Sequence, residues 1–217
     1  MQVPQGRTSS DPSQAVGART RRRPAPVIPP GPLPTEGVEL AAAAARQLDW
    51  TGVVLPETTL FGRRVHLVAR PRTDVHAERI ATGAGPVTDK ATVATWTWPE
   101  LEHTAPAAAV DVVGAVAVAR HWRTALANAV PFTRYFPAAV VLPSAAMMTH
   151  DYVNNCLPRA RAYGIAVLSV DEAAAVSRDL SGDAGRVIPA DDANSRWIEE
   201  VAYDQLLTTA DVSACVE

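Results

Sequence analysis

The chain of 217 residues contains only two cysteines, Cys156 and Cys215. Two thiols cannot form a disulfide framework, so the sequence excludes a disulfide-stabilised secreted domain and indicates a reduced, cytoplasmic setting. Cys156 falls on a predicted helix without a basic partner, and we expect it to be buried and structural. No cysteine–histidine cluster has zinc spacing, and we predict neither a metal site nor a cofactor.

Long apolar runs are also missing. No stretch of about 18 apolar residues lacks charge or proline, so we predict no transmembrane helix and no membrane partner. No apolar segment follows the first basic residue, and we therefore expect no secretory signal. Lysine is nearly absent, because Lys90 is the only one and the other 19 basic residues are arginines. Together with abundant alanine and valine, this composition indicates a GC-rich genome such as that of an actinobacterium.

The charge of the chain is uneven. Residues 1–35 contain five arginines and one acid, a net charge of +4, whereas residues 36–217 carry −7. The first segment is rich in proline, serine and glycine, and we predict a disordered tail. Its triplet Arg21, Arg22 and Arg23 is a candidate contact for phosphates or an acidic partner, and a solvated leader is the alternative. The acidic remainder argues against a strong nucleic-acid footprint on the domain itself.

Residues 36–217 are predicted to form one α/β domain. Its first half is expected to contain a helix over 36–50, strands over 52–55 and 61–68, a loop over 71–89 and a strand over 91–98. Residues 64–70 alternate between polar and apolar, as a half-buried strand does, and His66 falls on the polar side.

The segment 107–171 carries the clearest pattern. We expect a valine-rich strand over 110–119, a helix over 122–129, a strand over 138–142, a helix from Thr149 to Gly164 and a strand over 165–170. A single helix over 110–130 is the alternative to the first strand. After this segment we predict a helix over 172–180 capped by Asp171, a short strand over 186–189 and an amphipathic helix over 194–209. Helices between successive strands indicate a mixed central sheet with flanking helices.

Within this segment, residues 121–132 (HWRTALANAVPF) resemble the helix that follows the catalytic strand in restriction-endonuclease-like proteins of the PD-(D/E)xK superfamily. A tryptophan, an Ala-Leu pair, a Gln-Ala pair and a tyrosine recur there at this spacing, although Asn128 and Phe132 replace the glutamine and the tyrosine. Residues 136–143 and 163–171 resemble the two strands that follow. The resemblance covers about 60 residues and implies an αβββαβαβ order.

The chemistry of that superfamily needs an acid on one strand and a Glu/Asp-x-Lys pair on the next, where the carboxylates hold Mg²⁺ and activate water. The resemblance places the acid near His66 and the pair at Val116 and Val118. One register away the pair falls at Ala117 and Ala119. Hard cations need oxygen ligands, which none of these side chains supplies, so the resemblance implies a scaffold without its usual active site.

Three functions follow from these observations. The first is a catalytically inactive nuclease-like protein that binds DNA or a protein partner as a regulatory factor. The second is a structural or protein-interaction module that uses the tail and the surface around Trp96 and Trp98. The third is a metal-dependent nuclease with a migrated active site. The arginines that could contact phosphates in the first are Arg120, Arg123, Arg159 and Arg161. The migrated site of the third would use Asp111 or Asp74, together with Glu100 or Lys90.

Overall fold

The computed structural model describes residues 31–183, 185 and 192–214. The strands are β1 (Val53–Val54), β2 (Thr58–Leu60), β3 (Arg63–Pro71), β4 (Val110–Val118), β5 (Ala138–Pro143), β6 (Ala166–Val170) and β7 (Val176–Leu180). The α-helices are α1 (Gly37–Gln47), α2 (Thr73–Thr82), α3 (Lys90–Thr95), α4 (Trp122–Ala129), α5 (Leu157–Tyr163) and α6 (Ala193–Ala214). The predicted tail lies outside the described residues up to position 30.

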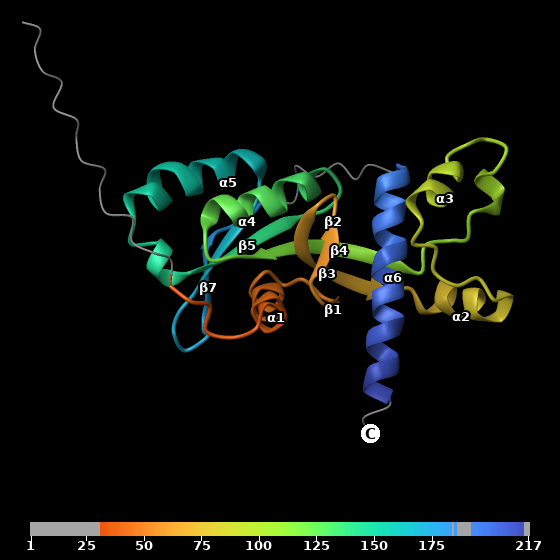
Figure 1. Ribbon diagram of the computed structural model, residues 1–217, viewed down its shortest axis with the longest axis horizontal. Helices are drawn as coiled ribbons and strands as arrows, with labels where there is room; N and C mark the ends of the chain where they lie inside the picture. The colour runs from red at the N-terminus through yellow and green to blue at the C-terminus, as the bar shows by residue number, and fades with distance from the viewer. Residues whose placement is uncertain (1–30, 184, 186–191, 215–217) are drawn as a thin grey trace, which may run out of the picture.

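The seven strands form one mixed sheet with helices on both faces (Figure 1). The strand order is β1-β3-β4-β5-β6-β7, and β2 pairs with β3 beside this path. β4, β5 and β6 are parallel and are joined by α4 and α5, whereas β3 and β7 run antiparallel to their neighbours. The predicted α/β class with a mixed central sheet is confirmed. Because residues 110–118 are extended, the alternative of one long helix is wrong.

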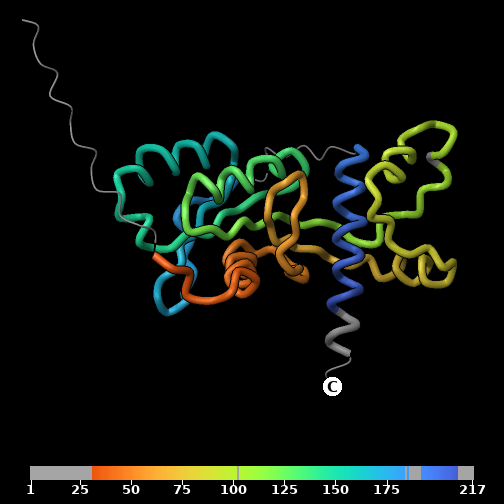
Figure 2. Tube along the Cα trace, in the orientation of Figure 1, coloured from red at the N-terminus to blue at the C-terminus, as the bar shows by residue number. Residues whose placement is uncertain are grey.

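The two faces of the sheet have separate apolar cores. On one face Leu40 and Ala44 of α1 pack against Val116, Val141 and Leu168. On the other face α4, α5 and α6 pack against the alternate side chains of the strands, which point away from α1. All residues of β5 and β6 are buried, as expected of parallel strands that are covered on both sides. Figure 2 shows α2 and α3 beyond α6, at the end of the molecule away from α5.

The turn after α1 places an aromatic ring on the sheet. Asp49 adopts a left-handed φ of 56°, and the N–H of Trp50 donates to the Ala45 carbonyl at 2.9 Å, which closes the helix end. The Trp50 ring then lies on Gly114 of β4. A Cβ at Gly114 would lie 2.6 Å from Cη2 of that ring, so only glycine leaves room for the indole.

Two predictions between β3 and β4 are wrong. Residues 71–89 were expected to form a loop, but they contain α2, whose end is marked by Gly83 with a left-handed φ of 70°. Residues 91–98 were expected to form a strand, but they contain α3. Asp89 caps α3 by accepting a hydrogen bond from the Thr92 N–H at 2.8 Å. Alternating threonines indicated a strand here, and the local cap prevailed over that pattern.

The predicted helix over 172–180 is also wrong, because Asp171 organises a turn in its place. Its Oδ1 accepts hydrogen bonds from the N–H groups of Ala173 and Ala175, both at 2.9 Å, and Ala174 takes a left-handed φ of 63°. The chain thereby reverses and β7 pairs with β6. The backbone hydrogen bonds gained at the sheet edge outweigh the helix propensity of three alanines.

The remaining helices agree with the sequence. Thr149 Oγ1 accepts a hydrogen bond from the Tyr152 N–H at 3.2 Å, and a π-helical turn (Tyr152–Cys156) leads into α5, which ends at Gly164 with φ of 70°. The predicted helix over 194–209 is part of α6, whereas the predicted strand over 186–189 lies outside the described residues. None of the helices in the described part of the chain combines the length and apolarity that crossing a membrane requires.

Candidate functional site

The positions that the resemblance assigned to catalysis lie together in the sheet. His66 of β3 is the direct partner of Val116 across the antiparallel β3–β4 ladder. Val118 follows two residues later, and side chains two apart on a strand share a face. This face is the one covered by α1, where Val116 is fully buried and Val118 is partly buried.

His66 is buried, with only 2% of its surface exposed. The expected alternation is present, but α1 covers the side that was predicted to be polar, so β3 is buried on both faces at its centre. The Nδ1–H of His66 donates to the Leu55 carbonyl at 3.1 Å, because a carbonyl can only accept. Burial lowers the pKa of the imidazole, although the Leu55 carbonyl and Glu57 partly oppose this effect. With a pKa below the ordinary value of 6.5, the imidazole of His66 is mostly neutral at pH 7 in the folded protein.

The first turn of α1 closes the space above the imidazole. A Cβ built on Gly37 would lie 3.0 Å from Nε2 of His66, so the helix backbone approaches the ring closely. Nε2 is buried and has no hydrogen-bond partner in the described part of the chain. The neighbouring side chains on this face, Val68, Val116 and Ala139, carry no oxygen. These three side chains therefore offer no oxygen ligand for a hard cation such as Mg²⁺.

The residues considered for a migrated metal site lie on separate elements. Asp111 is on β4, where Oδ2 lies 3.2 Å from Nη2 of Arg70, while Asp74 is in the first turn of α2. Lys90 starts α3, and its Nζ lies 4.7 Å from the centre of the Phe61 ring. Glu100 follows α3. Within residues 31–183, 185 and 192–214, no three His, Cys, Asp or Glu side chains form a group that could hold a metal ion.

A second cluster forms where β4 and β5 end. The indole N–H of Trp122 donates to Asp151 Oδ2 at 2.8 Å, and Nη2 of Arg123 lies 3.1 Å from the same oxygen. Trp122, with smaller contributions from Asn155 and the neighbouring arginines, lowers the pKa of the Asp151 carboxyl. Arg123 and Arg159 both lie over the Trp122 ring, with Cζ at 4.5 and 5.4 Å from its centre. This arrangement holds two guanidinium groups at one place on the surface.

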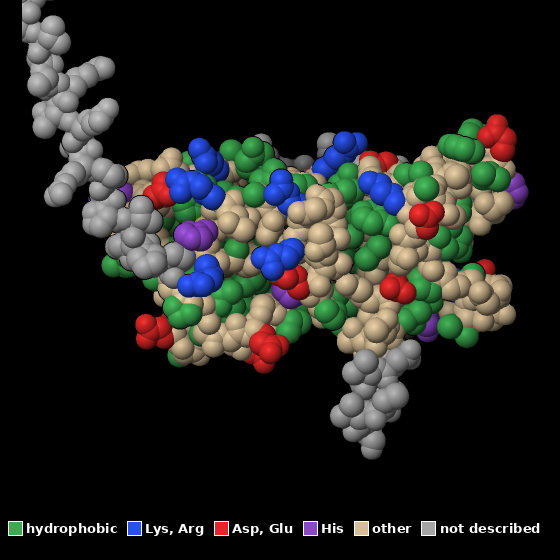
Figure 3. All heavy atoms as spheres, viewed as in Figure 1, with side chains coloured by type: hydrophobic (Ala, Val, Ile, Leu, Met, Phe, Trp, Pro, Cys, Tyr) green, Lys and Arg blue, Asp and Glu red, His purple; other side chains and the backbone are tan. Residues whose placement is uncertain are grey.

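The other predicted arginines lie near this cluster or outside the described residues. Arg120 is exposed, and its Nε donates to the Gly31 carbonyl at 3.3 Å, where the described chain begins. Arg161 is exposed on α5. Arg21, Arg22 and Arg23 lie outside the described residues. In Figure 3 the Lys and Arg side chains of the viewed face are spread over its upper and middle parts from α5 to α6, and acidic side chains are more frequent along the lower edge and toward α2 and α3.

Sequence reasoning missed Asp151, which joins α4 to the turn before α5. The available signal was Trp122, because a buried indole N–H usually needs an acceptor. It also missed the hydrogen bonds that Asp179 accepts from Tyr152 Oη at 2.6 Å and from Ser169 Oγ at 3.0 Å. Cys156 is buried as expected, and burial raises the pKa of its thiol to about 11, which keeps the group unreactive.

Comparisons of the chain with models of known protein families, with curated proteins and with solved structures found no match.

Proposed function

We propose that this protein is a non-catalytic DNA-binding regulatory factor on a restriction-endonuclease-like scaffold, and that it contacts phosphates through α4 and α5. The observation that carries the proposal is the separation of charge. Residues 119–164 contain five arginines and one aspartate, a net charge of +4, whereas the remainder of residues 36–217 carries −11. A positive surface on an acidic protein directs a polyanion to one face.

The position of the arginines in the fold supports this surface. Arg120 and Arg123 follow the carboxyl end of β4, and ligands of open α/β sheets bind outside the carboxyl ends of strands. The stacking of Arg123 and Arg159 on Trp122 limits their side-chain motion, which reduces the entropy lost on binding. Guanidinium groups also match the geometry of phosphate oxygens.

The basic triplet of the predicted tail is a further candidate contact for DNA. Gly31 accepts its hydrogen bond from Arg120, so the chain before it starts at the basic face. Gly31 follows Arg23 by eight positions, and a chain of that length spans at most about 29 Å. The triplet Arg21, Arg22 and Arg23 is therefore within reach of a duplex that is bound at α4 and α5.

The apolar surroundings of His66 support binding without cleavage. Mg²⁺-dependent hydrolysis on this scaffold would require acids at the positions of His66 and Val116 and a lysine at that of Val118. Val116 and His66 are buried beneath α1, and their neighbours supply hydrocarbon. The proposed protein keeps the packing of the scaffold and uses its exterior.

A salt-titrated anisotropy assay with a labelled DNA duplex tests the proposal. If four arginines contact phosphates, the slope of log K against log[salt] is about −3 to −4. The first variant replaces four arginines with alanine, namely Arg120, Arg123, Arg159 and Arg161. We expect this variant to lose most of the salt slope. Replacement of the tail triplet as well should reduce the slope further.

A charge-matched control separates the face from net charge. It changes four exposed arginines on other elements, namely Arg46, Arg70, Arg72 and Arg178. DNA affinity should then fall much less than in the α4–α5 variant. Equal losses in the two variants, or no binding by the unmodified protein at low salt, would contradict the proposal. Divalent-ion-dependent cleavage would contradict its non-catalytic part.

An acidic protein partner is the second candidate. Three apolar side chains on the segment that leads into and forms α5 are exposed: Met148 by 89%, Val153 by 57% and Tyr163 by 51%. Arginine, methionine and tyrosine are enriched in protein interfaces, and DNA backbones make little use of exposed apolar groups. Replacement of Met148 and Val153 by serine should leave DNA affinity unchanged and weaken a protein partner in a quantitative pull-down.

A further inference from the structure

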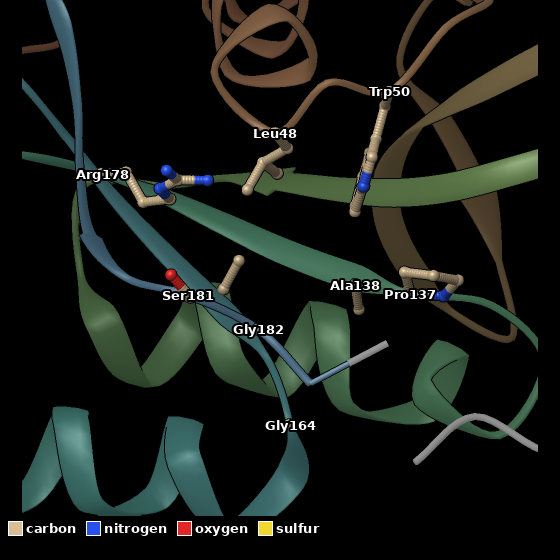
Figure 4. A pocket seen from close by; sticks show the side chains of 9 residues that line it. Leu48, Trp50, Pro137, Ala138, Gly164, Arg178, Ser181 and Gly182 are labelled. Carbon is tan, nitrogen blue, oxygen red and sulfur yellow. The ribbon is translucent and has the colours of Figure 1, made fainter. Parts of the chain in front are cut away.

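A cleft of about 150 Å³ opens on the α1 side of the sheet, at the amino ends of β5 and β6 (Figure 4). One part of its lining is apolar and consists of Leu48, Trp50, Pro137, Ala138 and Ala166. The other part contains Arg178 of β7 and Ser181. None of these residues belongs to the His66 position or to the α4–α5 face, so the cleft is a separate feature.

The guanidinium of Arg178 is turned toward this cleft. Arg178 is the partner of Leu168 across the β6–β7 ladder, and Leu168 belongs to the core beneath α1. Residues opposite each other in a ladder point to the same side of the sheet, so Arg178 faces α1. Figure 4 shows its side chain extending toward Leu48. Within the part of the chain that the structure describes, the Arg178 side chain makes no hydrogen bond or ion pair with another residue.

Trp50 forms a rigid wall of the same cleft. The hydrogen bond from its N–H to Ala45 holds its backbone at the end of α1, and Gly114 allows its ring to lie directly on β4. At the floor, a Cβ on Gly182 would lie 2.9 Å from the Gly164 carbonyl oxygen, so the segment after β7 closely approaches the end of α5. The cleft thus exists before any ligand binds, which lowers the cost of binding.

We propose that this cleft binds a small carboxylate that carries a single aromatic ring. A cavity of about 150 Å³ is large enough to hold benzene in an engineered protein, so one ring fits this space. Trp50 and Leu48 offer the ring an apolar and aromatic surface. The planar fork of Arg178 matches the two oxygens of a carboxylate, and the Ser181 hydroxyl supplies a further donor. This proposal does not depend on DNA binding.

Sodium benzoate is the probe for the test, with benzamide as its uncharged equivalent. The full-length protein is titrated while the indole N–H resonance of Trp50 is followed by NMR and assigned with Trp50→Phe. We expect benzoate to shift this resonance with a dissociation constant on the order of millimolar, as its nine non-hydrogen atoms allow. Benzamide should bind at least about tenfold more weakly, because its single neutral oxygen replaces the two charged oxygens that pair with Arg178.

Arg178→Gln should weaken benzoate binding by about tenfold and leave benzamide binding unchanged. Because Arg178 is exposed, this variant should fold, and its circular dichroism spectrum checks that it does. Arg72→Gln, at an exposed arginine outside both proposed sites, is the matched control and should bind benzoate as the unmodified protein does. No shift of the Trp50 resonance with benzoate, equal affinities for the two probes, or an Arg178→Gln variant that retains full benzoate affinity would each overturn the proposal.

Discussion

His66 and Val116 face each other across the β3–β4 ladder, and α1 buries both of them. At this pair, an imidazole hydrogen-bonded to a backbone carbonyl stands where the proposed resemblance to nucleases would place an acid. The packing of α1 on this pair is therefore one reason for proposing that the protein does not catalyse hydrolysis.

His66 should make stability depend on pH. Burial lowers its pKa in the folded protein below the ordinary value of 6.5, so the unfolded chain takes up the proton first. The stability that depends on neutral His66 is then fully present above about pH 6.5, and the free energy of unfolding falls as the pH drops below that value. One such group changes the unfolding free energy by at most about 1.4 kcal/mol per pH unit.

Urea denaturation between pH 7 and pH 5 checks this prediction. His66→Gln keeps a donor for the Leu55 carbonyl but does not titrate, so its stability should fall less over this range. An identical pH dependence in the variant and the unmodified protein would show that His66 does not contribute.

Val116→Asp should destabilise the protein by about 3 to 5 kcal/mol, or prevent folding, because it buries a carboxylate without a partner. Val118→Asp should cost less, since Val118 is only partly buried. Urea unfolding of both variants measures the difference. A Val116→Asp protein with unchanged stability would mean that α1 leaves this position open to water.

Arg79 and Glu200 form a buried ion pair that connects α2 to α6. Nη1 and Nη2 of Arg79 donate to the two carboxylate oxygens at 2.7 and 2.9 Å, and the two side chains are 2% and 1% exposed. Glu200→Gln leaves the guanidinium without its counterion and should cost about 3 to 5 kcal/mol. The double change Arg79→Met and Glu200→Met should cost less than the sum of the single changes, and a strictly additive result would contradict the coupling.

Gly114→Ala should displace Trp50, because the added Cβ would meet the indole ring. We expect a loss of about 1 to 3 kcal/mol, measured by thermal or urea unfolding. The same change in a Trp50→Ala background should cost little. Gly85→Ala is the control, since nothing lies within 4 Å of its Cβ, and it should have almost no effect.

Asp151→Asn should strengthen DNA binding if α4 and α5 form the contact surface. The amide oxygen still accepts from the Trp122 N–H, while the negative charge beside Arg123 disappears. Each added positive charge in the contact steepens the salt slope by about 0.9. A salt-titrated anisotropy assay measures both, and unchanged or weaker binding would count against this surface.

Local sequence patterns predicted the helices and strands correctly where a continuous apolar run or a helix-ending glycine marked the element. The valine-rich run of β4, the continuous apolar runs of β5 and β6, and Gly164 at the end of α5 predicted their elements from the sequence. The predictions failed at α2, α3 and β7, where Gly83, Asp89 and Asp171 acted through one left-handed residue or two local hydrogen bonds. Such signals are short, and the competing propensities of threonine and alanine concealed them.

The candidate sites divide in the same way. The absence of oxygen ligands at Val116 and Val118 could be read from the sequence, because it depends only on residue identity and strand periodicity. The burial of His66, the contact of Asp151 with Trp122 and the cleft between Trp50 and Arg178 could not.

By itself the sequence determined the α/β class, the parallel strands β4 to β6 and the apolar character of the expected catalytic positions. The tertiary structure alone decided which polar groups meet, since Trp122 and Asp151 are 29 residues apart and Arg79 and Glu200 are 121 apart. Periodicity acts between neighbours along the chain, whereas these contacts depend on how helices pack on a sheet.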